Sequence, residues 1–164
     1  IFPYIQKNLD DIITVEDDEL IAAFLDMVEN HKMIVENSGL LTVAALNQLK
    51  VKGKRVVSIL SGGNMDVITM SSVVQQGLIF RDRIFTVSVL LPDKPGELAR
   101  VADTIANVQG NVIKLEHNQF VSTNRNAAVE LRITLEAFGT EHKSQIIEAL
   151  EKGGYQPKIV RTSL

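Results

Sequence analysis

The sequence has 164 residues, of which 45% are hydrophobic, and a formal net charge of −3, which argues against a binding surface for nucleic acid or an anionic membrane. It contains no cysteine, which excludes disulfides and thiolate metal sites and fits the cytoplasm. No apolar run approaches the ~20 residues of a membrane span, and no signal peptide is recognised.

The first half of the chain alternates short apolar runs with helical patterns. Strands are predicted at residues 12–15, 32–36 and 55–60. Helices are predicted after each, with an apolar stripe at residues 20–28, a largely apolar helix from Gly39 to about Val51, and a helix from Asp66 to about Gln76. This alternation is typical of α/β folds, but it supplies too few strands for a complete sheet. Because the chain also begins with Ile1 rather than Met, we expect a piece of a longer protein.

Two sets of side chains, a run of carboxylates and the histidines, can be considered as metal or catalytic sites. Carboxylates crowd residues 16–19, where the dipole of a helix start favours negative charge; no histidine or turn is there to help hold a cation. The histidines are His31, His117 and His142, and they fall in unrelated elements. We therefore predict no metal site and no catalytic triad.

The turn that follows the third predicted strand is the strongest candidate for a ligand site. Ser61, Gly62, Gly63 and Asn64 interrupt the apolar run abruptly, and glycines allow a sharp bend or a close approach to a ligand. Asp66 can then cap the following helix. In open α/β sheets, ligands bind where a strand ends and a helix begins, although most such short turns bind nothing.

Glu36 is the second candidate in this half, because its carboxylate lies at the end of a predicted strand in apolar company. Two interpretations stay open from the local sequence. It is either a carboxylate that lines a pocket or a solvent-facing strand end.

In the second half of the chain, apolar residues recur with a period of two, which is typical of strands. Apolar residues alternate along predicted strands at residues 84–91, 111–120, 127–135 and 155–160, with helices from about Leu98 and from Thr140, and a hairpin turn at residues 122–126. The order β-α-β-β-α-β predicts a ferredoxin-like α+β domain with an antiparallel sheet and two helices on one face. An exposed sheet edge favours pairing of two copies.

A small-ligand site is also predicted in this half. We expect the segment Asp93, Pro95, Gly96 and Leu98, with Asp93 as the helix cap, to lie close to Asn111 and Val112. Free N–H groups of the first helix would suit a carboxylate there, so an acidic or zwitterionic ligand could bind. An ordinary capped turn is the alternative.

Several motifs in this order resemble the C-terminal part of a known family. They are ITVEDDEL, KMIVENSGLLTVAAL and VVSILSGGNMD in the first half, and LLPDKPGELARV, GNVIKLEHNQF and VELRITLE in the second. Together they resemble the serine/threonine dehydratases that use pyridoxal phosphate (PLP), with a tryptophan-synthase-β-like fold, followed by an ACT regulatory domain. Threonine dehydratase (threonine ammonia-lyase) with a single ACT domain is the nearest type. The resemblance implies a catalytic portion at residues 1–80 and an ACT domain at residues 83–164.

The resemblance assigns roles to the candidate residues. Ser61 would hydrogen-bond the pyridine nitrogen of PLP, Gly62, Gly63 and Asn64 would shape the wall beside the ring, and Glu36, with Gly39 three residues on, would lie near the cofactor. The implied reaction deaminates L-threonine to 2-oxobutanoate and ammonia. The ACT domain would bind an amino-acid effector, regulate the catalytic part and mediate homo-oligomerisation.

Two features of the family have no counterpart in this sequence. The motif that carries the lysine that binds PLP covalently is missing, and so is the glycine-rich loop for the cofactor phosphate. We therefore expect no catalytic residue here and an inactive isolated chain. A free-standing ACT-type module that binds amino acids or dimerises without catalysis is the alternative, as is a tail that only sets the oligomeric state.

Overall fold

The computed structural model describes residues 1–118 and 128–163, and the chain divides into two compact units. The first unit comprises Ile1–Gly77 and the second Leu78–Leu164. The hairpin predicted at residues 122–126 lies outside the described residues. None of the described helices is long and apolar enough to cross a membrane.

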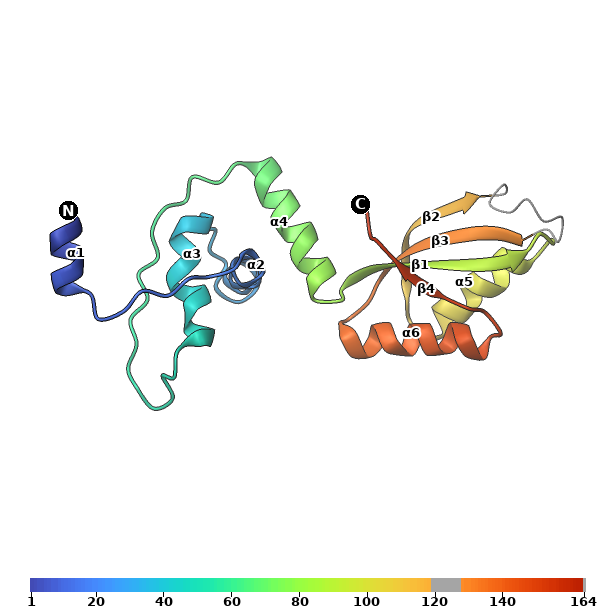
Figure 1. Cartoon of the computed structure of the whole chain (residues 1–164). Helices are drawn as coiled ribbons and strands as arrows, with labels where there is room; N and C mark the ends of the chain where they lie inside the picture. The colour runs from blue at the N-terminus through green and yellow to red at the C-terminus, as the bar shows by residue number, and fades with distance from the viewer. Residues whose placement is uncertain (119–127, 164) are drawn as a thin grey trace. The chain divides into compact units, whose positions relative to one another are not determined.

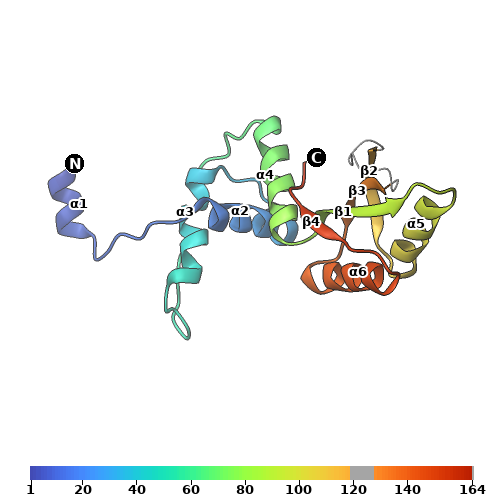
Figure 2. The ribbon, with the colours of Figure 1, turned by 45° about the vertical axis from the view of Figure 1, so that its right-hand side comes forward.

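The second unit is built on a four-stranded antiparallel sheet, which confirms the predicted antiparallel sheet. Its elements are β1 (Ile84–Pro92), α5 (Glu97–Asn107), β2 (Asn111–Asn118), β3 (Ala128–Glu136), α6 (Thr140–Lys152) and β4 (Lys158–Val160). The spatial strand order is β2-β3-β1-β4, so β1 and β3 are central and β2 is an edge strand. Figure 1 shows both helices below the sheet, and the turned view of Figure 2 shows α6 below the strands with α5 to the right of them.

Strict alternation along β1 and β3 separates the two faces of this sheet. The residues of β1 and β3 that face the helices are fully buried with apolar residues of α5 and α6: Phe85, Val87, Val89, Leu91, Leu131, Ile133, Leu135, Val101, Ile105, Ile146 and Leu150. The opposite face is polar: Ser88 donates a 2.6 Å hydrogen bond to Glu130, and the hydroxyls of Thr86 and Thr134 lie 3.0 Å apart. The buried apolar face thus fixes the strand register.

The first unit is helical. It contains α1 (Phe2–Asn8), α2 (Asp17–Asp26), a π-helical turn η1 (Met27–His31), α3 (Asn37–Ala44) and a 3-10 turn η2 (Ala45–Gln48). The helix α4 (Val67–Phe80) begins in this unit and ends in the second. The buried core of the first unit consists of Phe24, Met27, Val35 and Leu40. The helix α4 packs against this core through Met70, Val73 and Val74.

The three strands predicted in the first half are wrong. Residues 12–15, 32–36 and 55–60 form no strand, and the apolar side chains of Val57 and Ile59 are 87% and 72% exposed. A strand exists only where a second strand accepts its hydrogen bonds. Among the described residues, no backbone hydrogen bond joins two of these segments; Glu36 N–H donates instead to the carbonyl of Gly62, at 3.3 Å, in the turn that follows residue 60.

Candidate functional site

The turn Ser61–Asn64 and Glu36 are brought together by the first unit. Glu36 lies directly before α3, and its main chain is hydrogen-bonded to Gly62. Its side chain reaches the same turn, because Oε2 accepts a 3.2 Å hydrogen bond from the backbone N–H of Asn64. Oε1 accepts a 2.6 Å hydrogen bond from the hydroxyl of Ser38. Residues 36 and 61–64 therefore share one small region of the first unit.

Two glycines allow this close approach. Gly62 has φ +78°, in the left-handed region, and a Cβ at this position would overlap the carboxylate of Glu36. Gly39 is buried in the first turn of α3, and a Cβ there would overlap the carbonyl of Ser61. Gly63 is different, since its Cβ would meet nothing closer than 3.8 Å.

The four residues of the turn are exposed, whereas Glu36 is half-buried. The side-chain hydroxyl of Ser61 makes no hydrogen bond to any described residue, so it can donate or accept one from a ligand. Ser61 is thus exposed on a turn that is held by hydrogen bonds to Glu36 and packs closely against Gly39 of α3.

Asp66 links this turn to α4, as predicted. Its Oδ1 accepts hydrogen bonds from the backbone N–H groups of Ile68 and Thr69, both at 2.9 Å, in the manner of an N-cap. The hydroxyl of Thr69 also donates to this carboxylate, and this bond, followed by the backbone bonds, holds the pKa of Asp66 below its ordinary value. Asp66 therefore caps α4 in its ionised, carboxylate form.

A second candidate site lies in the other unit, beside the start of α5. A pocket of about 350 Å³ is lined by Leu91, Pro92, Asp93, Lys94, Pro95, Gly96, Glu97, Leu98, His117 and Val129. Leu91 and Val129 are buried and form an apolar floor, and Asp93, Lys94, Glu97 and His117 supply charged or polar groups at its rim. This pocket contains every residue predicted in the segment 93–98.

Asn111 and Val112 do not belong to this pocket, so the expectation that they lie close to Asp93 within one chain is wrong. Asn111 pairs with Glu136, which pairs with Ile84 at the start of β1, whereas Asp93 follows the other end of β1. The nine residues from Ile84 to Pro92 span about 27 Å from the first to the last at the rise of a strand. The side chain of Asn111 instead donates a 3.1 Å hydrogen bond to Glu136.

The start of α5 also differs from the prediction. The N-cap is Gly96, with φ +91° and no side-chain hydrogen bond, rather than Asp93. The backbone N–H of Lys94 bonds to the carbonyl of Pro92, which makes a turn before the helix begins at Glu97. Asp93 is thereby left exposed at the pocket rim.

Leu91, Pro92, His117 and Val129 line this pocket but were not predicted from the sequence, and of these only His117 has a polar side chain. It lies on β2 opposite Leu131, two residues from Val129 on β3. The alternation of β2 would have placed it on the face of Leu115, but the bulge between Val112 and Lys114 and the strand register, which only the folded chain shows, decide which end of the sheet it reaches.

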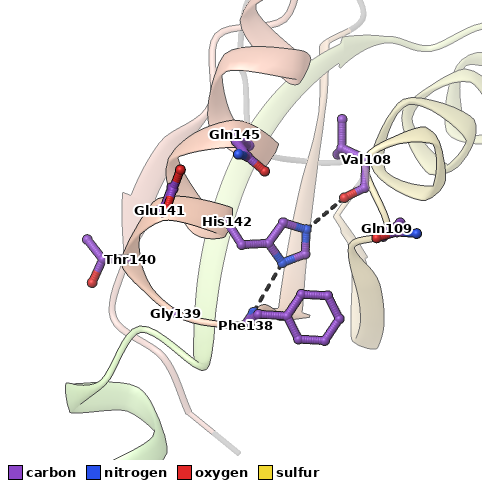
Figure 3. Close-up of a pocket in the computed structure, with 8 residues that line it drawn as sticks. All are labelled: Val108, Gln109, Phe138, Gly139, Thr140, Glu141, His142 and Gln145. Atoms are coloured by element: carbon purple, nitrogen blue, oxygen red, sulfur yellow. Dashed lines mark hydrogen bonds between the residues drawn. The ribbon is translucent and has the colours of Figure 1, made fainter.

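A third hollow, of about 430 Å³, lies between the end of α5 and the start of α6 (Figure 3). His142 is at its centre and both ring nitrogens are engaged. Nδ1 accepts a 3.1 Å hydrogen bond from the backbone N–H of Phe138, and Nε2 lies 2.7 Å from the carbonyl of Val108, to which it must donate. His142 is therefore a structural tie and not a free base, and the described residues contain no cluster of His, Asp or Glu that could hold a metal ion.

Comparison with known proteins found similarity along almost the whole chain. L-threonine ammonia-lyase of Geobacter sulfurreducens is 35% identical over 162 residues, which cover 98% of this chain and 40% of that protein. L-threonine ammonia-lyase of Thermotoga maritima is 31% identical and covers 97% of this chain and 40% of that protein. A biosynthetic L-threonine dehydratase of Staphylococcus aureus is 28% identical over 130 residues.

The chain spans about two fifths of the length of the first two of these relatives. No protein-family profile matches it. The similarity thus confirms the resemblance to the C-terminal part of threonine dehydratases.

Proposed function

We propose that this chain, a homologue of the C-terminal part of L-threonine ammonia-lyases, completes the catalytic unit of such an enzyme with residues 1–80 and regulates it through an ACT domain at residues 83–164. The observation that carries the proposal is the 35% identity over 98% of the chain, which includes both units. The complete protein would convert L-threonine to 2-oxobutanoate and ammonia in the cytoplasm.

The turn Ser61–Asn64 has the chemistry needed to hold the ring of PLP. When bound, PLP supplies an electron sink that allows the α-proton of the substrate to be removed and the β-hydroxyl to leave. The free hydroxyl of Ser61 can hydrogen-bond the pyridine nitrogen. Because a serine is too weak an acid to keep that nitrogen protonated, it would leave the ring a mild electron sink, which suits β-elimination.

The other residues of the turn would shape the space around the ring. Gly62 and Gly63 carry no side chain that could block a flat ring, and Asn64 is held by its N–H to Glu36. The lysines of residues 1–80 are all exposed: Lys7, Lys32, Lys50, Lys52 and Lys54. A lysine that binds PLP covalently is usually activated by burial, so the nucleophile is expected in an upstream segment.

Val57 and Ile59 support the same proposal. These side chains extend from a segment whose backbone N–H groups, at residues 55–60, donate to no described residue. Exposed apolar side chains on an unpaired extended segment suit a strand that is completed by neighbours. We propose that an upstream part of the protein supplies them.

Adding PLP to the purified 164-residue chain tests the missing nucleophile. We expect no absorbance band of a covalent PLP–lysine adduct and no threonine turnover. A borohydride-trapped adduct on one lysine would contradict the proposal. Sequencing the gene upstream of Ile1 should reveal roughly 200 to 250 residues with the lysine motif. If the gene starts here, the alternative of a free-standing ACT-type module holds.

Replacing Ser61 in the complete protein tests its role at the ring. We expect Ser61→Ala to change the cofactor absorbance and to lower kcat for threonine by at least tenfold, because the ring nitrogen loses its partner. Ser72→Ala, at an exposed position of α4, is the control. Equal spectra for the two variants would contradict the assignment.

The pocket beside α5 is the proposed effector site. Its rim combines acidic side chains (Asp93, Glu97) with the ammonium of Lys94 and the imidazole of His117, which suits the ammonium and carboxylate of an amino acid. The apolar floor of Leu91 and Val129 suits a small aliphatic side chain. Asn111 and Val112 can contribute only if they come from another copy of the chain, since they lie far from this pocket.

Thermal unfolding with amino acids tests this site. Isoleucine, valine, threonine or serine at millimolar concentration should raise the melting temperature, because a ligand that binds only the folded state stabilises it. His117→Ala should reduce the shift, and His31→Ala, in the other unit, should not. No shift with any amino acid would contradict the regulatory role.

The edge strand β2 is the proposed contact between copies. Val112, Ile113 and Leu115 are 37%, 46% and 40% exposed on this strand. An exposed apolar edge favours pairing with a second strand. Leu115→Lys should therefore lower the molar mass of the protein in solution measured by light scattering, whereas an unchanged mass would rule out pairing through β2.

A further inference from the structure

The carboxylate of Glu36 uses both oxygens within the protein, and this changes the role that the family resemblance implies for it. We infer that Glu36 is a positioning residue that holds the turn of Ser61 against the start of α3, rather than a group that meets the cofactor or the substrate. We call Glu36, Ser38, Gly62 and Asn64 the turn clamp. The inference rests on the proposed role of Ser61.

The first observation is a two-point attachment between segments that are 26 to 28 residues apart. The main chain of Glu36 donates to the carbonyl of Gly62 at 3.3 Å, and its side chain accepts from the N–H of Asn64 at 3.2 Å. These two bonds lie on either side of Gly63 and restrain the conformation of the turn, whereas a single bond would let the turn rotate. Ser61 directly precedes the restrained residues 62–64.

The second observation is that Ser38 holds the carboxylate in this orientation. Its hydroxyl donates to Oε1 at 2.6 Å, while Oε2 is directed to Asn64. Hydrogen bonds to ionised groups are stronger than bonds between neutral groups. Each carboxylate oxygen therefore already accepts one hydrogen bond, Oε1 from α3 and Oε2 from the turn, and both bonds serve to hold the two segments together.

The third observation is the requirement for glycine at position 62. The carboxylate of Glu36 occupies the space that a Cβ of Gly62 would fill. Gly62 also has φ +78°, which penalises any other residue at this position. The glycine and the glutamate thus depend on each other, and this dependence can be measured.

Amide hydrogen exchange of Asn64 in the 164-residue chain, followed by NMR, tests the clamp. Glu36→Gln keeps the shape but offers one acceptor in place of two, so we expect the protection of Asn64 N–H to fall about tenfold or more. Ser38→Ala removes one bond only and should lower it by a smaller factor. Glu151→Gln, on the exposed end of α6, is the matched control and should leave it unchanged. Protection within twofold of the wild type in Glu36→Gln would overturn the inference.

A double-mutant cycle tests the dependence between Gly62 and Glu36. Gly62→Ala should lower the protection of Asn64 strongly when Glu36 is present, because the new methyl displaces the carboxylate. The same change in a Glu36→Ala background should have a much smaller effect, since only the backbone penalty remains. Gly63→Ala, where the Cβ meets nothing closer than 3.8 Å, is the control glycine. Additive effects of the two changes would contradict the clamp.

The cofactor spectrum of the complete protein separates positioning from mere stability. A displaced Ser61 should shift the absorbance of bound PLP in Glu36→Gln in the same direction as in Ser61→Ala, with the pH profile of turnover unchanged in shape. If Glu36→Gln leaves the spectrum of the folded protein unchanged while Ser61→Ala shifts it, the positioning role is overturned. If Ser61→Ala has no effect, the proposed function fails, and the clamp is judged by Asn64 protection alone.

Discussion

Gly39 determines how closely α3 approaches the turn that carries Ser61. A Cβ at this buried position would overlap the carbonyl oxygen of Ser61 and crowd the side chain of Val35. Because backbone atoms cannot move aside as a flexible side chain can, the segment would have to shift. Position 39 must therefore be glycine because of the packing of α3 against the turn, and neither segment shows this by itself.

We expect Gly39→Ala to lower the free energy of unfolding by about 1–3 kcal/mol, the range for overpacked sites. Gly63→Ala, in the neighbouring turn, has room for its Cβ and should change it by less than about 0.5 kcal/mol. Urea unfolding followed by circular dichroism measures both. Equal stability of the two variants would show that the turn moves away freely.

Asp82 is a second residue whose side chain connects separate segments of the chain. Its carboxylate lies 2.6 Å from Lys143 Nζ and accepts a 2.8 Å hydrogen bond from the hydroxyl of Thr140, so it ties residue 82 to the first turn of α6. The bond from Lys143 holds the pKa of Asp82 below its ordinary value, although partial burial acts in the opposite direction. The folded state therefore binds a proton less readily than the unfolded state does.

This direction fixes the pH dependence. The stabilisation from Asp82 is complete above the unfolded pKa of about 4 and is lost as the pH falls through the lower folded pKa. We expect Asp82→Asn to cost about 1–2 kcal/mol at pH 7 and progressively less below pH 4. Asp103→Asn, at an exposed position of α5, is the control. A cost for Asp82→Asn that is the same at pH 7 and pH 2.5 would contradict the ionic tie.

At the scale of elements, α6 is secured at its start by two different ties. Asp82 bonds to Thr140 and Lys143, and His142 connects the end of α5, at Val108, with the segment before α6, at Phe138. The ring of Phe138 also stacks on His142 with centroids 4.8 Å apart (Figure 3). These ties fix the helices relative to each other on one face of the sheet.

His142→Ala should destabilise the chain by about 2–3 kcal/mol, because it removes two hydrogen bonds and leaves the half-buried carbonyl of Val108 unpaired. Gln145→Ala, which lines the same hollow one turn later, should cost less than about 0.5 kcal/mol. Chemical denaturation of both variants provides the comparison. A loss in His142→Ala no larger than that of the control would show that water replaces the tie.

At the scale of the whole molecule, the two units differ in what holds their backbone. The second unit has a ladder in which β1 is paired on both sides, whereas residues 55–60 of the first unit donate no backbone hydrogen bond to any described residue. Backbone groups outside a ladder or helix exchange their protons with solvent quickly.

Hydrogen exchange measured by mass spectrometry should therefore show residues 55–60 labelled within seconds and residues 85–89 protected longest. In the complete protein, the proposed upstream strands should slow exchange at residues 55–60, with residues 85–89 serving as the internal control. Fast exchange at residues 55–60 in both proteins would contradict the proposal that this segment is part of a larger sheet.

The sequence by itself determined the second unit well. Alternation of apolar residues predicted β1 and β3, and apolar stripes predicted α5 and α6, in agreement with the structure. These strands form as predicted because every strand of the sheet finds its partner within the unit. The family resemblance implied only that Glu36 and the turn at Ser61 lie near one ring, and the hydrogen bond between Glu36 and Asn64 was found in the structure.

Only the tertiary structure decided which residues share a pocket and which apolar runs become strands. Residues 55–60 have the composition of a buried strand, but a strand needs a neighbour to accept its hydrogen bonds, and none is present among the described residues. Likewise, the register of β2 placed His117 in the pocket that Asp93 also lines and carried Asn111 to the opposite end of the sheet. Local patterns specify which face a side chain takes, whereas the pairing of distant segments specifies its neighbours.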